Sequence, residues 1–499
     1  MIFLKTLAYR VGKRLMSTAL KDNLNDKSYL ESRIVNWLTS PYRMEQLTGE
    51  RYYHGDHDIL RKKRTTIGED GELHEVKNLP NNRNVDNQYA KMVDQKNNYL
   101  LGQPIAFDSD NQKYVEALQK VFNRRFQKTL KDLGEDCLNH GISWLYPYIN
   151  NGELRFKRFP GYEILPFWKD VAHTELEMAV RFYLEEKPHA INEHDVIQKV
   201  EIYSENGVDY YTFENNKLVP EVNKLHENYL TVKTNETEQG YNWERIPLIP
   251  FKFNSKEIPL IKRCKNIQDA INEIISTFKN VMEEDTRNTI IVLENYDGQN
   301  LGEFRKNLAL YGAVKVRSGD GARGDVRTLR IEVNAANYEA ILKIFKKAMI
   351  DNCKGYDFDQ LRENSRDPNQ MVVKTIYADT DLDANCMITE FNCAIEQLLW
   401  FVNKYLSMTG EGEFSEHEVD IIFNKDTIIN ESEIMQMLVS AGVRVPNEVL
   451  LNQVPFINDV KEAMILLKQE EREAMDAYNG ELPLGGKDDR LQNNKSNKR

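Results

Sequence analysis

Apolar and polar residues tend to alternate through residues 142–253. The segments SWLYPYIN, ELRFKRF, EMAVRFYLEE, VIQKVEIYSENG and VDYYTFEN all show this pattern. Turn-forming sequences at 150–152 (NNG) and 206–207 (NG) separate some of them. A period of about two residues, interrupted by turns, is typical of antiparallel strands. The pattern therefore predicts an antiparallel sheet of several strands in this region.

A helical period replaces the alternation from about residue 258. Apolar side chains recur at spacings of three and four at Cys264, Ile267, Ile271, Ile274, Phe278 and Val281. This spacing predicts a helix over 258–286 with one face packed on another helix. Further helices are expected over 335–355 and, as the longest of the chain, over 373–409. Short β-rich segments (NTIIVLEN, AVKVR and DVRTLRIEV) lie between the first two helices.

The N-terminal part mixes helices with a hairpin. Residues 28–60 favour helix, and a hairpin with Asp70-Gly71 at its turn follows. A helix is then expected over 85–101, and another over about 111–140. One face of the 85–101 helix carries Val85, Tyr89, Met92, Val93, Lys96 and Leu100.

Beyond the long helix, a strand is expected over 415–424, followed by shorter helices at 430–441, 446–452 and 457–478. The polar tail at 481–499 has a composition typical of disorder. Residues 1–14 are basic and free of acids, which leaves open a targeting or membrane-surface helix. A poorly ordered end is the simpler interpretation.

Composition narrows the functional classes. The 499 residues include 66 Lys and Arg against 78 Asp and Glu, for a net charge of -12. Proteins that simply coat nucleic acid are usually basic, so any DNA contact must be local. No run of about 18 apolar residues occurs, which excludes a transmembrane helix by sequence. Five cysteines without paired spacing argue against a disulfide framework or a structural zinc site.

Three motifs imitate known sites. Gly319, Gly321 and Gly324 match a dinucleotide fingerprint, but a strand follows them where a helix is required, so a hairpin loop is favoured. The carboxylates spaced like a calcium loop are Asp379, Asp381, Asp383 and Glu390. Because Ala384 stands where that loop needs glycine, an acidic patch near a helix start is favoured. The pairs His54/His57 and His189/His194 lack a completing ligand set.

No nucleophile motif or phosphate-binding loop occurs in the sequence. There is accordingly no positive argument for catalysis, and neither a cofactor nor a metal is expected.

Two basic features stand out in this acidic chain. On a helix over 335–354, four lysines fall within an arc of about 100°: Lys343, Lys346, Lys347 and Lys354. They form either an ordinary solvated face or a row that meets a polyanion. The second feature is the segment 305–330, with Arg305, Lys306, Lys315, Arg317, Arg323, Arg327 and Arg330. Its positive charge suits DNA or an acidic partner.

The order of these parts resembles the portal proteins of tailed bacteriophages, of the siphovirus type from Gram-positive hosts. The resemblance is carried by RYYHGDHDILRKKRTTIGEDG (51–71), NQYAKMVDQKNNYLLGQPI (87–105), RIPLIPFKFN (245–254), MVVKTIYADTDLDANCMITEF (371–391) and INESEIMQMLVSAGVRVPNEVLLNQVPFINDVKEAMILL (429–467). It covers about residues 28–478. The loop RENSRDPNQ before the long helix departs from the family, whose loop is commonly rich in Gly and Ser.

The resemblance implies an α+β portal fold with an antiparallel β wing, a two-helix stem that brackets a small β clip, a long kinked helix and a helical crown. The implied parts are an N-terminal arm (1–27), wing (28–257), stem helices (258–286 and 335–355), clip (287–334), tunnel loop (356–372), long wing helix (373–409), crown (410–480) and disordered tail (481–499).

The resemblance also implies a non-enzymatic role. About twelve copies would form a ring at one capsid vertex, through which double-stranded DNA is packaged and ejected. The expected DNA-channel residues are Lys343, Lys346, Lys347, Lys354, Arg366, Asn369 and Gln370. The clip residues expected to meet the motor or adaptor are Arg305, Lys306, Lys315, Arg317, Arg323 and Arg327.

The implied partners are the terminase large subunit, a head–tail adaptor, and the major capsid and scaffolding proteins, with no membrane. Assembly would take place in the bacterial cytoplasm, and the mature protein would belong to the virion. Two alternatives stay open at this point. One is a metal-dependent DNA-processing enzyme that uses Asp379, Asp381, Asp383 and Glu390. The other is a head–tail connector or scaffold-type capsid protein.

Overall fold

The computed structural model describes residues 26–67, 71–77, 79–186, 196–234, 237–287, 290–294, 318–319, 322–323, 325–329, 335–357 and 370–425. The chain divides into two units, of which the first holds 1–360 and 376–427 and the second 361–375 and 428–499. The predicted helices at 430–441, 446–452 and 457–478, and both predicted disordered ends, lie outside the described residues. The fold below is that of the first unit.

The segment predicted as one helix over 28–60 is broken into shorter pieces. Helix α3 (Lys27–Leu38) is followed by α4 (Pro41–Tyr53) and a 3-10 turn, η1 (Asp58–Arg61). The break follows from Ser40, whose hydroxyl accepts a hydrogen bond from the Arg43 backbone N–H and caps α4. Pro41 fits the first helical position because its missing N–H would have no partner there.

The predicted helix over 85–101 is confirmed as α5 (Gln88–Leu101). The single helix expected over 111–140 is wrong, since two helices occur there, α6 (Gln112–Val121) and α7 (Arg124–His140). Asn123 lies in extended conformation between them, and its side chain accepts hydrogen bonds from the backbone N–H groups of Arg125 and Phe126 in the first turn of α7. An asparagine that caps a new helix ends the previous one even where the apolar period continues.

The alternating region is antiparallel throughout, but it folds into separate sheets rather than one. A three-stranded sheet holds, in spatial order, β14 (Ile249–Lys252), β4 (Ile142–Asn150) and β5 (Glu153–Phe159). The two-stranded β12 (Leu230–Thr234) and β13 (Thr237–Tyr241) stand apart. A six-stranded sheet holds β6 (Ile164–Trp168), β7 (Leu176–Glu186), β8 (Val196–Ser204), β9 (Gly207–Glu214), β10 (Lys217–Pro220) and β11 (His226–Glu227).

A short 3-10 turn separates the two larger sheets. This turn, η2 (Gly161–Glu163), follows β5 and ends its pairing before β6 begins. Gly161 packs so closely on the preceding chain that a Cβ there would lie 2.1 Å from the Ile142 carbonyl oxygen. Strand β6 has no clear alternation, which explains why the sequence pattern did not reveal it.

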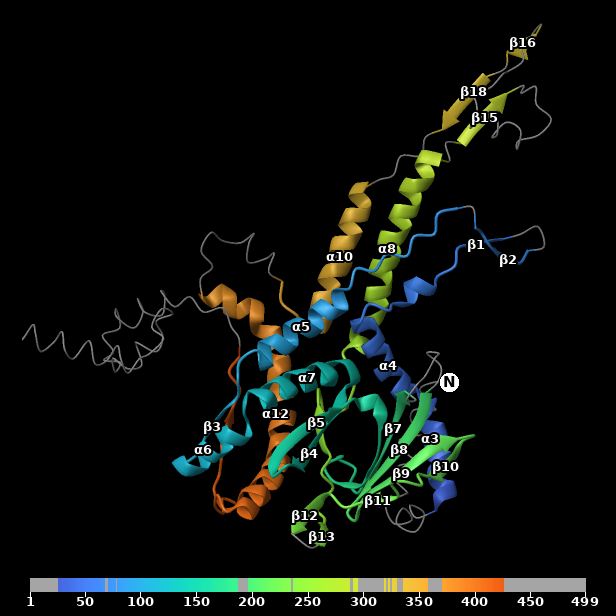
Figure 1. The fold of residues 1–499 in the computed structure, drawn as a ribbon. Coiled ribbons are helices and arrows are strands. Elements are labelled where there is room, and N and C mark those ends of the chain that lie inside the picture. The colour runs from blue at the N-terminus through green and yellow to red at the C-terminus, as the bar shows by residue number, and fades with distance from the viewer. Residues whose placement is uncertain are drawn as a thin grey trace, which may run out of the picture. The chain divides into compact units, whose positions relative to one another are not determined.

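Helix α3 covers one face of the six-stranded sheet (Figure 1). Its buried residues Leu30, Ile34 and Trp37 are spaced four and three apart, and so they lie on one side of the helix. They pack on apolar side chains of the strands, among them Phe167, Val180, Val200, Ile202 and Phe213. The six-stranded sheet and α3 thus share one apolar core.

A cluster of charged residues, which we call the sheet cluster, joins neighbouring strands of this sheet. Arg181 donates to the carboxylates of Glu163 at 2.9 Å and Glu201 at 3.2 Å. The hydroxyls of Tyr203 and Tyr183 also donate to Glu201, at 2.7 and 3.0 Å. Every member comes from β7, β8 or the adjoining turn η2.

The predicted helices after 258 are confirmed as α8 (Ile261–Arg287), α10 (Ala335–Cys353) and α12 (Gln370–Thr409). Strands β15 (Ile290–Glu294) and β18 (Asp325–Leu329) pair antiparallel beyond the ends of α8 and α10 (Figure 1). The glycine motif forms a hairpin as expected, since β16 (Ser318–Gly319) pairs with β17 (Ala322–Arg323). The predicted strand AVKVR (313–317) lies outside the described residues.

Two further pairs of short strands complete the fold. The predicted strand over 415–424 is reduced to β19 (Asp420–Ile422), which pairs with β3 (Ala106–Asp108). The hairpin expected around Asp70-Gly71 is confirmed as β1 (Thr65–Ile67) and β2 (Leu73–Glu75). The described residues therefore combine helices with antiparallel sheets, as the α+β class requires. None of their helices combines the length and apolar character that crossing a membrane needs.

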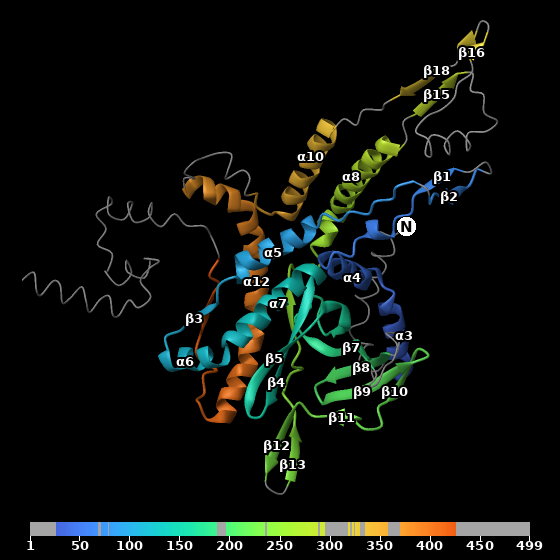
Figure 2. The same ribbon diagram turned by 45° about the horizontal axis from the view of Figure 1, so that its top comes forward.

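An extended segment, which we call the strap (residues 79–87), runs from the hairpin back to α5 along helix α8 (Figures 1 and 2). Polar side chains that recur every four residues along α8 accept hydrogen bonds from backbone N–H groups of the strap and of Tyr89, just after it. The pairs are Asn82 with Asn280 at 2.7 Å, Asn84 with Ser276 at 2.9 Å, Asp86 with Asn272 at 3.0 Å and Tyr89 with Gln268 at 2.9 Å.

This ladder of hydrogen bonds follows from matching repeats. Four residues of helix rise about 6 Å, and two residues of extended chain span about 6.6 Å. Alternate backbone N–H groups of the strap therefore meet successive turns of α8. The buried side of α8 is thus partly polar. The sequence pattern had predicted that α8 packs through its apolar positions from Cys264 to Val281, but most of these are only half-buried.

Candidate nucleic-acid interface

Helix α10 has a packed side and a basic side. Met349 and Cys353 are buried, and the Tyr338 ring packs at a tilt against Phe278 of α8, with ring centroids 4.9 Å apart. At 100° per residue, Lys343 and Lys347 lie about 40° apart and roughly 90° or more from that packed side, while Lys354 follows the last residue of the helix. Lys343 and Lys347 of the predicted row therefore form an exposed basic side of α10, which stays the candidate surface for DNA.

Two of the row's lysines are solvent-facing. Lys343 and Lys347 are both exposed, and Lys343 contacts Glu339 one turn earlier on the same helix at 3.1 Å. An exposed ion pair at this spacing contributes only about 0.3–0.5 kcal/mol, because water and salt screen it. The pair with Glu339 therefore leaves the Lys343 ammonium able to exchange its partner for a phosphate.

Lys346 is positioned differently. Its ammonium lies 2.8 Å from a carboxylate oxygen of Asp86 in the strap. Asp86 is itself fixed, since its backbone N–H and C=O bond to Asn272 and Gln268 of α8. Lys346 thus ties α10 to the strap at one edge of the lysine row.

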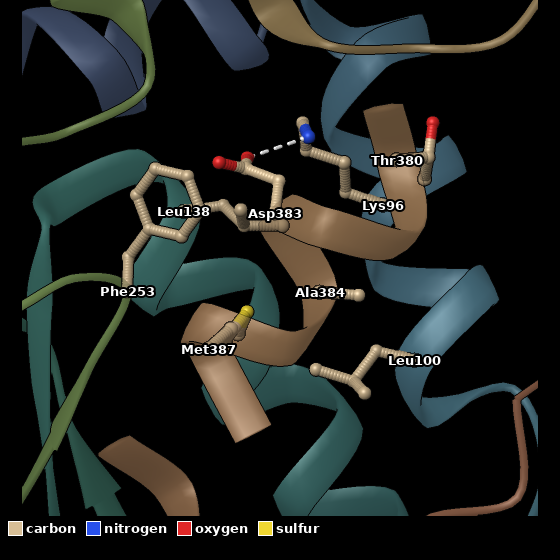
Figure 3. Close-up of a pocket in the computed structure, with 8 residues that line it drawn as sticks. All are labelled: Lys96, Leu100, Leu138, Phe253, Thr380, Asp383, Ala384 and Met387. Atoms are coloured by element: carbon tan, nitrogen blue, oxygen red, sulfur yellow. Dashed lines mark hydrogen bonds and ion pairs between the residues drawn. The ribbon is translucent and has the colours of Figure 1, made fainter. Parts of the chain in front are cut away.

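Lys354 belongs to a set of charges that we call the junction cluster. In it, the carboxylate of Asp383 on α12 meets Lys96 of α5 at 2.8 Å, Arg263 of α8 at 3.0 Å and Lys354 at 3.3 Å. Figure 3 shows Lys96 and Asp383 pointing toward each other from their two helices. The side chains of Lys96 and Asp383 are each only 6% exposed. One anion therefore joins four segments that are distant in sequence.

The turn after α10 is held by the same residues. Lys354 has a φ of 52°, in the left-handed region that non-glycine residues rarely adopt. Its carbonyl oxygen accepts hydrogen bonds from the Lys96 ammonium at 3.2 Å and the Thr380 hydroxyl at 2.9 Å. At Gly355, a Cβ would lie 2.6 Å from the Met92 sulfur, so a larger residue does not fit without movement. The direction in which the chain leaves α10 is accordingly fixed by contacts with α5 and α12.

Electrostatics favour the ionised form of Asp383. Burial alone would raise its pKa, but the charges and hydrogen bonds of Lys96 and Arg263 hold the pKa of Asp383 below its ordinary value. Burial lowers the pKa of Lys96, and the charge of Asp383 offsets only part of that effect. The junction cluster therefore depends on the ionised carboxylate of Asp383, which all three cations share.

A small cavity adjoins the junction cluster. It is lined by Lys96, Leu100, Leu138, Phe253, Thr380, Asp383, Ala384 and Met387 (Figure 3). Its volume is about 10 Å³, which is space for about one water molecule. A cavity of this size cannot hold a nucleotide or an organic substrate.

The other residues expected to touch DNA or the motor can be placed only in part. Arg366 and Asn369 lie outside the described residues, as do Arg305, Lys306, Lys315 and Arg317. Gln370 is the first residue of α12. Arg323 lies on β17 and Arg327 on β18. The assignment of these residues to the channel and the clip stays a prediction.

The carboxylates spaced like a calcium loop lie on one continuous helix. Asp379, Asp381, Asp383 and Glu390 all belong to α12. Residues two apart on a helix point in directions about 160° different, so Asp381 faces away from Asp383. Asp381 accepts from the Tyr99 hydroxyl at 3.0 Å and pairs with Lys425. The metal-loop interpretation is therefore wrong, and Asp383 is a buried ion-pair partner rather than a solvated acid.

Within the described residues, one group has metal-ligand chemistry, namely Glu50, Asp136 and His140. His140 bonds to Glu50 at 2.8 Å, and Asp136 pairs with Arg158. Burial would raise the pKa of Glu50, but the hydrogen bond and charge of His140 hold it below the ordinary value. These partners account for the group as a hydrogen bond between α4 and α7 and an ion pair between α7 and β5.

A family model described as "Phage portal protein, SPP1 Gp6-like" matches residues 43–477. The chain belongs to this family of phage portal proteins. The portal protein of Bacillus phage SPP1 is 29% identical over 458 residues, which cover 90% of this chain and 88% of that protein. The portal protein of Clostridium phage phiCD119 is 24% identical over 441 residues, or 86% of this chain and 93% of that protein.

Membership confirms the resemblance drawn from the sequence motifs, which pointed to phages of Gram-positive hosts. It also gives the stem lysines a context, because portal proteins are virion components that act in DNA packaging. The junction cluster, by contrast, was not found from sequence. Its one signal was Lys96, a lysine on the apolar face of a predicted helix, which indicates a buried partner of opposite charge.

Proposed function

We propose that this chain forms a closed ring of about twelve copies at one capsid vertex, and that double-stranded DNA passes through the ring during packaging and ejection. In this proposal the chain acts as a structural conduit and performs no chemistry. A partner, the terminase large subunit, uses ATP. The observation that carries the proposal is the lysine row on α10, an exposed cationic side of a stem helix in a chain of the portal family.

Charge supports a loose hold on DNA. The chain is acidic overall at -12, yet the lysine row concentrates positive charge on one helix side. A ring repeats that side once per copy and so creates a band of ammonium groups around its axis. Ammonium groups meet phosphates without reading bases, which suits DNA that must slide whatever its sequence.

The assigned channel residues are Lys343, Lys346, Lys347 and Lys354 on the stem, with Arg366, Asn369 and Gln370 near the start of the long helix. We place the contact with the terminase and the head–tail adaptor at the clip, through Arg305, Lys306, Lys315, Arg317, Arg323 and Arg327. The major capsid and scaffolding proteins would surround the ring, and assembly would occur in the bacterial cytoplasm.

Electron microscopy and native mass spectrometry of the purified full chain test the ring itself. We expect rings with a central hole wide enough for a DNA duplex, and a mass of about twelve chains. Compact monomers or dimers at high protein concentration would overturn the proposal.

Charge reversal in the lysine row tests the channel. Particles assembled with Lys343→Glu plus Lys347→Glu should contain several-fold less nuclease-protected DNA, because acidic groups in the band repel phosphates. The matched control is Lys128→Glu plus Lys131→Glu, which reverses two exposed lysines of α7. Rings should form in both cases. Normal DNA content with the first variant would remove the row from the channel.

A further inference from the structure

The β1–β2 hairpin exposes an apolar pair. Ile67 and Leu73 are opposite each other in the register, and so their side chains share one face. They are 72% and 69% exposed, and every residue of both strands is exposed. An isolated two-stranded hairpin is marginally stable in water. This one therefore needs a surface to pack on.

The base of the hairpin is anchored, which directs the pair outward. The Lys62 ammonium contacts Glu273 of α8 at 2.6 Å, and Arg64 donates to the Pro80 carbonyl oxygen at 2.8 Å. The strap then continues the attachment along α8 through its ladder of hydrogen bonds. The hairpin is thus fixed at its base and projects from the flank of α8 (Figure 2).

A complementary apolar patch lies on α10. Ile344 is 66% exposed and Ile341 is 43% exposed. At 100° per residue, Ile344 lies about 140° or more from the buried Met349 and Cys353, so it points away from the packed side, and Ile341 lies about 80° or more from them, at its border. Helix α8 stands between α10 and the hairpin in both ribbon views (Figures 1 and 2). The two apolar patches therefore occupy opposite flanks of the two-helix stem and cannot meet within one chain.

We propose that the Ile67–Leu73 face of one copy packs on the Ile341–Ile344 face of α10 in the next copy. This inference rests on the proposed ring and names a contact that would close it. A contact between two different patches on opposite flanks is head-to-tail, and repeated head-to-tail contacts form rings when the rotation closes.

Charge points to a second copy as the occupant. The sequence between the two strands, GEDGE (68–72), is acidic, and the row beside Ile344 is basic through Lys343 and Lys347. An acidic tip beside a basic helix favours this pairing and opposes contact between two identical hairpins. The hairpin and the α10 face of a second copy are thus complementary both in apolar surface and in charge.

Cross-linking tests the contact directly. Ile67→Cys combined with Ile344→Cys would be made in a full chain in which the exposed Cys386 and Cys393 are changed to serine. A short bismaleimide should join neighbouring copies into a ladder of covalent oligomers, and each single variant should give at least tenfold less product. Rings without a ladder would overturn this contact and leave the proposed ring intact. Wild-type chains that stay monomeric would overturn both.

A charge variant gives an independent measure. Ile67→Glu plus Leu73→Glu should raise the protein concentration needed for half-assembly at least tenfold. The matched control is Val171→Glu plus Val222→Glu, which makes the same change at two valines that are still more exposed. The control should assemble like the wild type, and circular dichroism checks that both variants fold. Equal assembly of the two variants would contradict the proposal.

Discussion

The sheet cluster and the junction cluster each surround one central charge with partners of opposite sign, but the central charge is positive in the first and negative in the second. In the sheet cluster, one cation, Arg181, lies between Glu163 and Glu201. In the junction cluster, one anion, Asp383, lies among Lys96, Arg263 and Lys354. Both place ionised side chains where water is scarce, so each central charge depends on its partners.

The two clusters differ in what they connect. The partners of Arg181 are 18 and 20 residues away and belong to the same sheet or its adjoining turn. The partners of Asp383 include residues 287 and 120 positions away, on separate helices. A local cluster stiffens one sheet, whereas the distant one fixes how the stem helices meet the long helix. Loss of Arg181 should therefore destabilise only its own sheet, whereas loss of Asp383 should destabilise several helices.

The largest effect is expected from Asp383→Asn. The amide keeps the shape but leaves three cations around a neutral group, and breaking a buried pair in this way costs about 3–5 kcal/mol. Denaturant unfolding at fixed protein concentration measures the loss. Hydrogen exchange should also rise together in α5, the base of α8 and the end of α10.

The control for this change is Asp379→Asn, an exposed position on the same helix. It should alter the free energy of unfolding by less than about 0.5 kcal/mol. A junction variant as stable as this control would show that Asp383 does not hold the helices together.

A smaller and more local effect is expected from Arg181→Met. Two carboxylates then lose their cation, but the hydroxyls of Tyr183 and Tyr203 still donate to Glu201. We expect a loss of about 2–3 kcal/mol, with faster hydrogen exchange confined to β6, β7 and β8. Arg61→Met, which breaks an exposed pair with Asp56, is the control and should leave the free energy of unfolding nearly unchanged, because water screens that pair. Exchange that spreads to the stem would contradict the distinction between the clusters.

The smallest effect is a difference in pH dependence. The partners of Asp383 lower its pKa in the folded chain, so its contribution is present near neutral pH and is lost as pH falls below about 4. Burial, the larger influence on Glu163, raises its pKa despite the charge of Arg181. The Glu163 contribution is therefore present at low pH and lost as pH rises through the folded-state pKa.

Unfolding between pH 3 and pH 7 compares the two carboxylates. The cost of Asp383→Asn should grow as the pH rises, and the cost of Glu163→Gln should shrink over the same interval. Parallel slopes for the two variants would show that the clusters do not differ in this respect.

The sequence predicted the regular features of the fold because they repeat locally. The seam from Cys264 to Val281 marked α8, and alternation marked strands β4, β5, β7, β8 and β9. The breaks at Ser40 and Asn123 were missed, although both residues are good helix caps, because the apolar period continued across them. A cap changes the backbone without changing the pattern on either side.

The candidate site was predictable only where it depends on one helix. The lysine row follows from spacing along α10, whereas the pairing of Lys346 with Asp86 depends on residues brought together from distant positions. The sequence does contain one signal for the contact between α8 and the strap. Gln268, Asn272, Ser276 and Asn280 recur every four residues, and a stripe of uncharged hydrogen-bonding groups on an otherwise amphipathic helix indicates a backbone partner.

The ladder between the strap and α8 also works as a ruler. Since only alternate N–H groups face the helix, a one-residue insertion between 82 and 86 would turn carbonyl oxygens toward side-chain acceptors. Length changes in this stretch would have to come in pairs, and each pair would shift the hairpin by about one helical turn. The height at which the hairpin leaves α8 is therefore set in discrete steps.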